Sequence, residues 1–144
     1  MPSWIYDGRI ITEISDMPEG TFGFIYEVIH TPTGRKYIGK KVLYFNRTLP
    51  PLTGQKRKRK IVKESDWKTY FGSHAEIVGL IKEGKQEEFT KQILCFVRSK
   101  KLLTYYETKY LFIKEVLEYR NNYINDNVLG KFYRKDFITP DTDD

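Results

Sequence analysis

A chain of 144 residues is long enough to bury one hydrophobic core but not two, so we expect a single domain. Its composition, 40% apolar and 15% aromatic with eleven tyrosines, excludes a disordered chain. No apolar run approaches the ~20 residues of a membrane-spanning helix, and the N-terminus lacks a basic start and an apolar stretch, so we expect neither a membrane nor a secreted protein. The single Cys95 can form no internal disulfide, which favours a reducing, cytoplasmic location.

The net charge of +6 is unevenly distributed along the chain. Residues 28–63 contain eleven Lys or Arg and no Asp or Glu, and the remaining 14 basic and 19 acidic residues leave the rest of the chain at −5. Such asymmetry indicates a basic surface that suits a polyanion. A basic run is often only a solvated loop, so the ligand interpretation depends on what else lies in the same segment.

The first half of the chain contains a predicted hairpin and two further predicted strands before the basic run. Residues 4–11 read as a short hairpin that turns at Asp7-Gly8, a favoured turn dipeptide. Residues 21–30 alternate as a strand, with Phe24 and Tyr26 on one side and Ile25 on the other. After a turn at residues 31–34, residues 36–43 form the antiparallel partner strand.

The next segment predicts a short helix start, a loop and a second helix. Residues 44–48 could begin a helix that Pro50-Pro51 stops, and residues 49–64 read as a mobile basic loop. Ser73 is a plausible N-cap with Glu76 three positions later, and the helix that follows ends at Gly84.

The second half predicts a third strand over residues 89–97 and the strongest helix of the chain over residues 100–119. Residues 130–137 add a short strand, and residues 139–144 form a flexible acidic tail. The order of strand, strand, helix, strand, helix indicates an α+β fold.

Glu107 is the carboxylate whose predicted position favours a role in a functional site. Leu103 lies four residues before it and Leu111 four after, so Glu107 projects near the apolar face of the predicted helix. A carboxylate there is costly unless it is paired or binds a metal. A salt bridge at the edge of the core is the alternative interpretation.

The two tyrosine motifs resemble those of the GIY-YIG nucleases. Gly23-Phe24-Ile25-Tyr26 precedes Tyr37-Ile38-Gly39, the two tyrosines lie eleven residues apart, and Arg47 follows ten residues beyond Tyr37. The resemblance covers residues 21–127. It implies a three-stranded antiparallel sheet flanked by helices, here with an N-terminal hairpin extension and a basic insertion loop, in one nuclease domain over residues 1–144.

The resemblance also implies a role for each site residue. Tyr37 is the general base that activates water, with Tyr26 assisting it, and a tyrosine is a poor base unless cations such as the flanking Lys36, Lys40 and Lys41 lower its pKa. Glu107 binds one Mg²⁺ or Mn²⁺. The remaining site residues are a phosphate-binding arginine, a histidine-like residue and a C-terminal asparagine: Arg47 (or Arg57 or Arg59 of the basic loop), Tyr70 or His74, and Asn125.

DNA is the partner that this interpretation implies. The residues expected to contact backbone phosphates are Lys40, Lys41, Lys56, Arg57, Lys58, Arg59 and Lys60. One such site cuts one strand, so double-strand cleavage implies a homodimer or two successive nicks. The segment with Trp67, Tyr70 and Gly72-Ser73 resembles that of free-standing, phage-encoded members, which implies a bacterial or phage-infected cell. The alternatives are a non-catalytic DNA- or RNA-binding module with the same fold, or a structural protein whose basic run is a nuclear-targeting signal.

Overall fold

A five-stranded mixed sheet forms the centre of the computed structural model, which describes residues 1–119 and 122–137. In spatial order its strands are β2 (Arg9–Ile11), β1 (Trp4–Tyr6), β7 (Phe89–Val97), β3 (Gly23–His30) and β4 (Arg35–Val42). Neighbours are antiparallel except β1 and β7, which run parallel. The predicted three-stranded sheet is therefore wrong in size, because the N-terminal hairpin joins the sheet through β1 instead of extending outside it.

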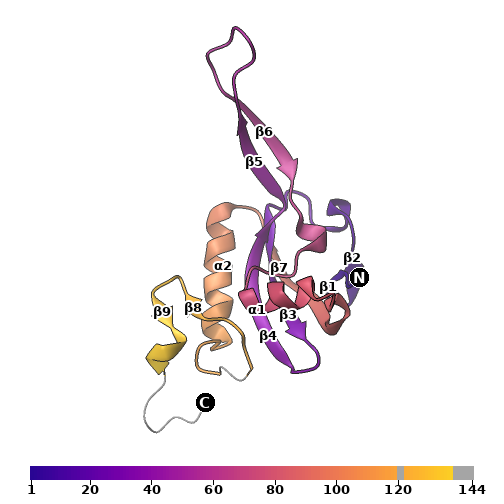
Figure 1. The fold of residues 1–144 in the computed structure, drawn as a ribbon, viewed down its shortest axis with the longest axis vertical. Coiled ribbons are helices and arrows are strands. Elements are labelled where there is room, and N and C mark those ends of the chain that lie inside the picture. The colour runs from indigo at the N-terminus through magenta and orange to yellow at the C-terminus, as the bar shows by residue number, and fades with distance from the viewer. Residues whose placement is uncertain (120–121, 138–144) are drawn as a thin grey trace.

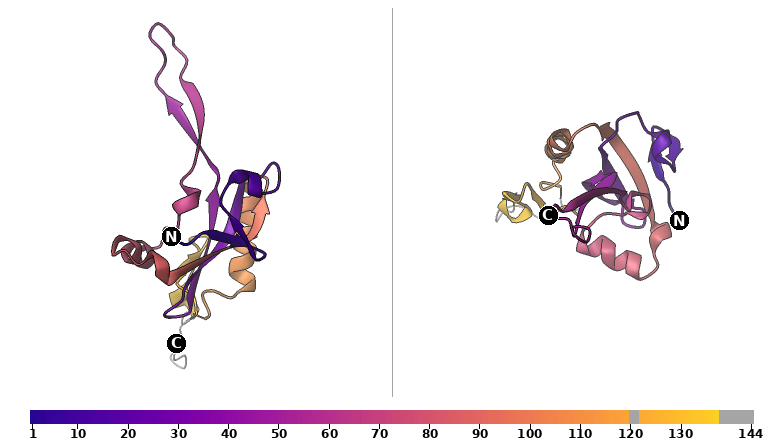
Figure 2. Two further views of the ribbon diagram at one scale, coloured as in Figure 1. Left: turned by 90° about the vertical axis from the view of Figure 1, so that its right-hand side faces the viewer. Right: turned by 90° about the horizontal axis from the view of Figure 1, so that it is seen from above.

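Two helices cover the two faces of this sheet, as Figure 1 and Figure 2 show. Helix α1 (Ala75–Lys82) lies on one face and helix α2 (Lys100–Ile113) on the other. The alternation predicted for β3 is confirmed, because Phe24 and Tyr26 enter the core on the α1 side and Ile25 the core on the α2 side. Short 3₁₀ helices complete the connections: Ile14–Asp16, Trp67–Thr69, Gln86–Glu88 and Arg134–Phe137.

The helix boundaries differ from the predicted ones at two ends. Helix α1 is capped by His74 instead of Ser73, since the backbone N–H of Glu76 donates to His74 Nδ1 at 3.2 Å. Helix α2 ends at Ile113, well before the predicted residue 119. Glu115 adopts a positive φ of 51°, which an α-helix cannot contain. The apolar pattern that predicted a longer helix continues past this break, since Val116 and Leu117 are buried in the same core as the apolar residues of α2.

The largest correction concerns residues 44–64, which form neither a helix nor a loop. Strands β5 (Tyr44–Leu49) and β6 (Arg59–Glu64) pair antiparallel over six residue pairs. We call this hairpin the arm; it projects away from the rest of the molecule (Figures 1 and 2). The Pro50-Pro51 pair follows directly after β5, where no further ladder N–H is required, so it ends a strand and not a helix.

The C-terminal segment adds a small hairpin beside α2. Strands β8 (Asn127–Val128) and β9 (Phe132–Tyr133) replace the single short strand predicted over residues 130–137. The predicted acidic tail, residues 139–144, lies outside the described residues. Within residues 1–119 and 122–137, every helix is too short or too polar to cross a membrane.

Candidate active site

A pocket of about 300 Å³ lies along the edge of β4, the outermost strand of the sheet. Side chains from both faces of the sheet can reach it, because none of the strands that the structure describes lies beyond β4. Its lining comes from β4, from the start of α1, from α2 and from the segment before β8: Tyr37, Ile38 and Lys40; His74; Thr104, Glu107 and Leu111; and Asn125, Asp126, Asn127, Leu129 and Gly130.

The two motif tyrosines lie together on the α1 side of the sheet. Their ring centroids are 6.3 Å apart, and Tyr26 is only 1% exposed whereas Tyr37 lines the pocket. Gly39 pairs with Tyr26 in the β3–β4 ladder and leaves room for its ring. A Cβ on Gly39 would lie 2.4 Å from Tyr26 Oη and 3.1 Å from Tyr37 Cε2, so the motif glycine is required by the close approach of both tyrosines.

The electrostatics of Tyr37 differ from the sequence expectation. Burial raises the pKa of Tyr37 above its usual 10, and a hydrogen bond with Ser73 only partly opposes this shift. The pKa of Tyr26 is raised still further by its burial. The flanking lysines do not reverse these shifts: Lys41 is bound to Asp66 at 2.6 Å, and Lys40 reaches toward α2. Both phenols are therefore protonated at neutral pH.

Glu107 reaches the pocket from α2 with a side chain that is 21% exposed. Burial raises the pKa of this carboxyl above 4.5, opposed by Lys40, whose Nζ lies 3.9 Å from Glu107 Oε1. The salt bridge that the sequence offered as the alternative is thus present between Lys40 and Glu107, but at 3.9 Å it is long. Lys40 Nζ also donates a hydrogen bond to Thr104 Oγ1 at 3.2 Å. Glu107 is a partly desolvated carboxylate with one distant cation.

This donor set suits a cation that retains most of its own water. No group of three or more His, Cys, Asp or Glu side chains in residues 1–119 and 122–137 is placed to enclose a metal ion. Mg²⁺ is commonly held by one or two carboxylates, with water and substrate phosphate completing its coordination. Glu107 fits that mode, with Asp126 as a second carboxylate in the pocket lining.

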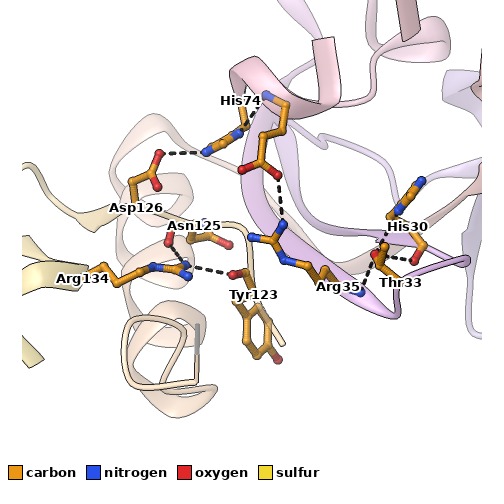
Figure 3. A network of polar contacts seen from close by, with 9 residues as sticks. His30, Thr33, Arg35, His74, Tyr123, Asn125, Asp126 and Arg134 are labelled. Carbon is orange, nitrogen blue, oxygen red and sulfur yellow. Dashed lines mark hydrogen bonds and ion pairs between the residues drawn. The ribbon is translucent and has the colours of Figure 1, made fainter. Parts of the chain in front are cut away.

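His74 and Asp126 form a pair at the rim of the pocket (Figure 3). His74 Nε2 lies 2.7 Å from Asp126 Oδ2, while Nδ1 accepts the backbone N–H of Glu76. The Nδ1 contact assigns the proton to Nε2, which donates it to Asp126. The imidazole lies 5.8 Å from the Tyr37 ring, between centroids, but both its nitrogens are engaged. Asp126 was not predicted, and no pattern in the sequence distinguishes it from other surface carboxylates.

Asn125 extends the sheet with its side chain. Its Oδ1 accepts the backbone N–H of Ile38 at 3.0 Å, and its Nδ2 donates to the Ile38 carbonyl at 2.8 Å. The adjacent backbone pairs with Lys36, and Arg134 donates to the carbonyls of Tyr123 and Asn125 (Figure 3). Asn125 thus fixes the C-terminal segment against the edge of β4.

The remaining predicted site residues lie outside the pocket lining. Tyr70 packs edge-on against Tyr26 at 5.9 Å, with Lys41 Nζ 3.9 Å from the centroid of its ring. Arg47 is exposed on β5, and as far as the structure describes the chain, no arginine lines the pocket. The other predicted basic residues are exposed on the arm: Lys56, Arg57, Lys58, Arg59 and Lys60. Among the seven basic residues predicted to contact DNA, Lys41 is the one that is buried, at 9% exposure.

A family comparison agrees with this arrangement. A family model described as "Putative endonuclease segE, GIY-YIG domain" matches residues 4–128. No curated protein and no solved structure matches the chain.

Proposed function

This chain belongs to the GIY-YIG family of endonucleases, and from that premise we propose that it hydrolyses phosphodiester bonds of DNA in the pocket beside β4. The observation that carries the proposal is the meeting of Tyr37 and Glu107 in one pocket, although they come from opposite faces of the sheet. A binding module needs a basic surface, but it has no need of a phenol and a desolvated carboxylate in one concave site.

Tyr37 is the residue that accepts a proton from the attacking water in this proposal. Its pKa is raised in the structure, so the phenol becomes a base only when cationic charge arrives in the pocket. Tyr26 acts as a positioning residue, since a side chain with 1% exposure contacts Tyr37 and Tyr70 but no substrate. Lys40 adds positive charge at the phosphate.

Glu107 would hold Mg²⁺ or Mn²⁺, and Asp126 is a second carboxylate on the lining of the same pocket. A divalent cation held by Glu107 would supply Lewis-acid chemistry, which stabilises charge on the phosphate and on the leaving oxygen. Glu107 keeps this capacity because Lys40, the cation paired with it among the described residues, lies 3.9 Å away.

Arg47 is the arginine we assign to the substrate phosphate. It shares a face of the arm with Phe45, because residues two apart on a strand point the same way. The Phe45 ring lies 5.1 Å from Lys41 Nζ, which also contacts Tyr70 on the tyrosine side of the sheet. Arg57 and Arg59 lie farther along the arm, in the tip and at the start of β6. One pocket cuts one strand, so we propose that two strands require a homodimer or two nicks.

The test is conversion of supercoiled plasmid to nicked and linear forms, with Mg²⁺ and with EDTA. We expect Tyr37→Phe, which removes the proposed general base, and Glu107→Gln, which removes the proposed metal ligand, each to lower the rate at least ~100-fold. Matched controls on exposed surface, Glu118→Gln and Tyr105→Phe, keep the wild-type rate. Cleavage that survives Glu107→Gln would contradict the assignment. Salt-sensitive binding of DNA without any cleavage by the wild type would favour the binding module.

A further inference from the structure

Within residues 1–119 and 122–137, the arm is mostly exposed, and its base contacts Lys41 through Phe45. All residues of β6 and five of the six residues of β5 are exposed, so neither face of the ribbon is covered. Its exposed apolar side chains include Ile61 at 38% and Val62 at 67%. A two-stranded hairpin alone is at best marginally stable in water, and exposed apolar side chains on a projecting element indicate a contact surface.

The charge of the arm identifies the chemistry of the partner. Residues 44–63 contain seven Lys or Arg and no Asp or Glu. A projecting element with this charge is complementary to a polyanion, and a nucleic acid is the polyanion that the proposed function supplies.

The two faces of the arm differ in charge. The register places the pairs Phe45–Lys63, Arg47–Ile61 and Leu49–Arg59 on one face, which we call the basic face. The opposite face carries the pairs Tyr44–Glu64, Asn46–Val62 and Thr48–Lys60. The basic face therefore holds three cations among apolar side chains, whereas the two charges of the opposite face cancel.

We propose that the arm lies in the major groove of duplex DNA, where Arg59 and Lys63 of its basic face reach the base edges while Arg47 keeps the phosphate contact proposed above. The major groove, ~12 Å wide, admits a two-stranded ribbon, and Arg and Lys read guanine there while apolar side chains contact the thymine methyl. Six paired residues at ~3.4 Å each span ~20 Å, or about six base pairs. The arm is thus a reader of duplex sequence, beyond a grip on backbone phosphates.

The position of the arm relates this reading to cleavage, and this part of the proposal rests on the proposed function. Strand β5 begins at Tyr44, two residues after β4 ends, and Lys40 of β4 lines the pocket. A duplex held by the arm therefore passes close to the edge of β4. The arm determines where along the duplex the pocket cuts.

The experiment measures binding apart from cleavage. The Glu107→Gln chain is mixed in EDTA with a 30-base-pair duplex pool that has been partly methylated by dimethyl sulfate, and the bound fraction is sequenced. Methylation at guanine N7 blocks the major groove, and methylation at adenine N3 blocks the minor groove. We expect interference at guanine N7 over about six base pairs.

Three variants test the role of each face. Neutralising the basic face, Arg47→Ala with Arg59→Ala and Lys63→Ala, should weaken binding at least tenfold. An equal change on exposed lysines of the helices and their ends, Lys82→Ala with Lys101→Ala and Lys114→Ala, should weaken it less than threefold. Ile61→Ser should alter the sequences recovered, and Val62→Ser on the opposite face should leave them unchanged.

A shortened arm completes the test. Replacing residues 46–62 by Asn-Gly joins Phe45 to Lys63 through a two-residue hairpin turn and removes no buried core residue. We expect an unchanged thermal midpoint, loss of N7 interference, and cleavage that is slower, because Arg47 is removed with the arm, and that no longer has a positional preference. Interference at adenine N3 alone, tighter binding of an RNA hairpin, or N7 interference that survives the shortening would overturn the proposal. If the wild type shows N7 interference but no cleavage, the proposed nuclease function is contradicted, whereas the proposed binding of the arm in the major groove is supported.

Discussion

Gly39 shows how a residue without a side chain organises the site. The β3–β4 ladder places it opposite Tyr26, and both tyrosine rings occupy the volume that a side chain would need. The third position of the motif is therefore a packing requirement of the two tyrosines and needs no role in the chemistry.

The change Gly39→Ala tests this requirement. The added Cβ, 2.4 Å from Tyr26 Oη and 2.6 Å from Cζ, must displace that ring and with it Tyr37. We expect cleavage to fall at least tenfold and stability to fall by ~1–3 kcal/mol, the usual cost of overpacking. Plasmid nicking and urea unfolding measure the two effects.

Gly79→Ala in helix α1 is the matched control. Nothing lies within 4 Å of a Cβ at that position, and alanine is favoured over glycine in a helix. We expect unchanged cleavage and a stability gain of ~0.5–1 kcal/mol. Equal losses in both variants would show that the effect is not local to the tyrosines.

Residue patterns predicted part of the site in advance. Tyr26 and Tyr37 follow from their motifs, and Glu107 from its apolar neighbours at four-residue spacing; the structure brings Tyr37 and Glu107 to one pocket. Asp126 could not be predicted, because its position depends on how the C-terminal segment returns to β4. The raised pKa of Tyr37 was also missed, since burial dominates there and burial follows from the tertiary fold.

At the scale of elements, Asn125 is the attachment point between the C-terminal segment and β4. Its amide replaces a backbone peptide group by both donating to and accepting from Ile38. Because Asp126 follows it directly, this attachment also places the His74–Asp126 pair at the pocket.

The pair of changes Asn125→Asp and Asn125→Leu should show a graded effect. Aspartate keeps the acceptor for Ile38 N–H but loses the donor, whereas leucine loses both hydrogen bonds in a side chain of similar size. We expect losses of ~1–3 kcal/mol for each buried group left unsatisfied, with leucine more affected. Urea unfolding measures the loss, and protease cleavage near residue 126 reports detachment of the segment. Equal stability of both variants and wild type would contradict this assignment.

The arm explains why element prediction failed between residues 44 and 64. The dense basic run and Pro50-Pro51 indicated a loop, but the prolines lie between two strands and interrupt neither. An exposed ribbon has no buried face, so it lacks the alternation of apolar and polar residues by which strands are recognised. Strands β3, β4 and β7 have such faces and were predicted within a residue or two.

At the scale of the whole molecule, Lys91 makes stability depend on pH. Its side chain is fully buried, its Nζ donates to the Lys68 carbonyl at 3.2 Å, and the rings of Trp4 and Phe71 lie 4.4 Å from it. Burial lowers the pKa of Lys91 from 10.5 to about 7. Above pH 7 the unfolded chain therefore binds a proton that the folded chain lacks, and stability rises with pH.

The change Lys91→Met should remove this dependence. In the wild type, the free energy of unfolding rises by up to ~1.4 kcal/mol for each pH unit between about 7 and 9. The stability of the variant should therefore exceed that of the wild type by the largest margin at pH 6–7. Urea unfolding at pH 6, 7.5 and 9 measures the slope, and Lys82→Met on the surface serves as control. A slope unchanged in Lys91→Met would contradict the assignment.

The pocket at the edge of β4 has a topological consequence. A site enclosed by a barrel or a tunnel requires that a chain enter by one of its ends. Here the residues proposed to react, Tyr37 and Glu107, lie along the side of the sheet, and no described strand lies beyond β4 to close that side. A polymer can therefore be engaged at its middle without threading, so a circular molecule, which has no terminus at all, is as accessible as a linear one.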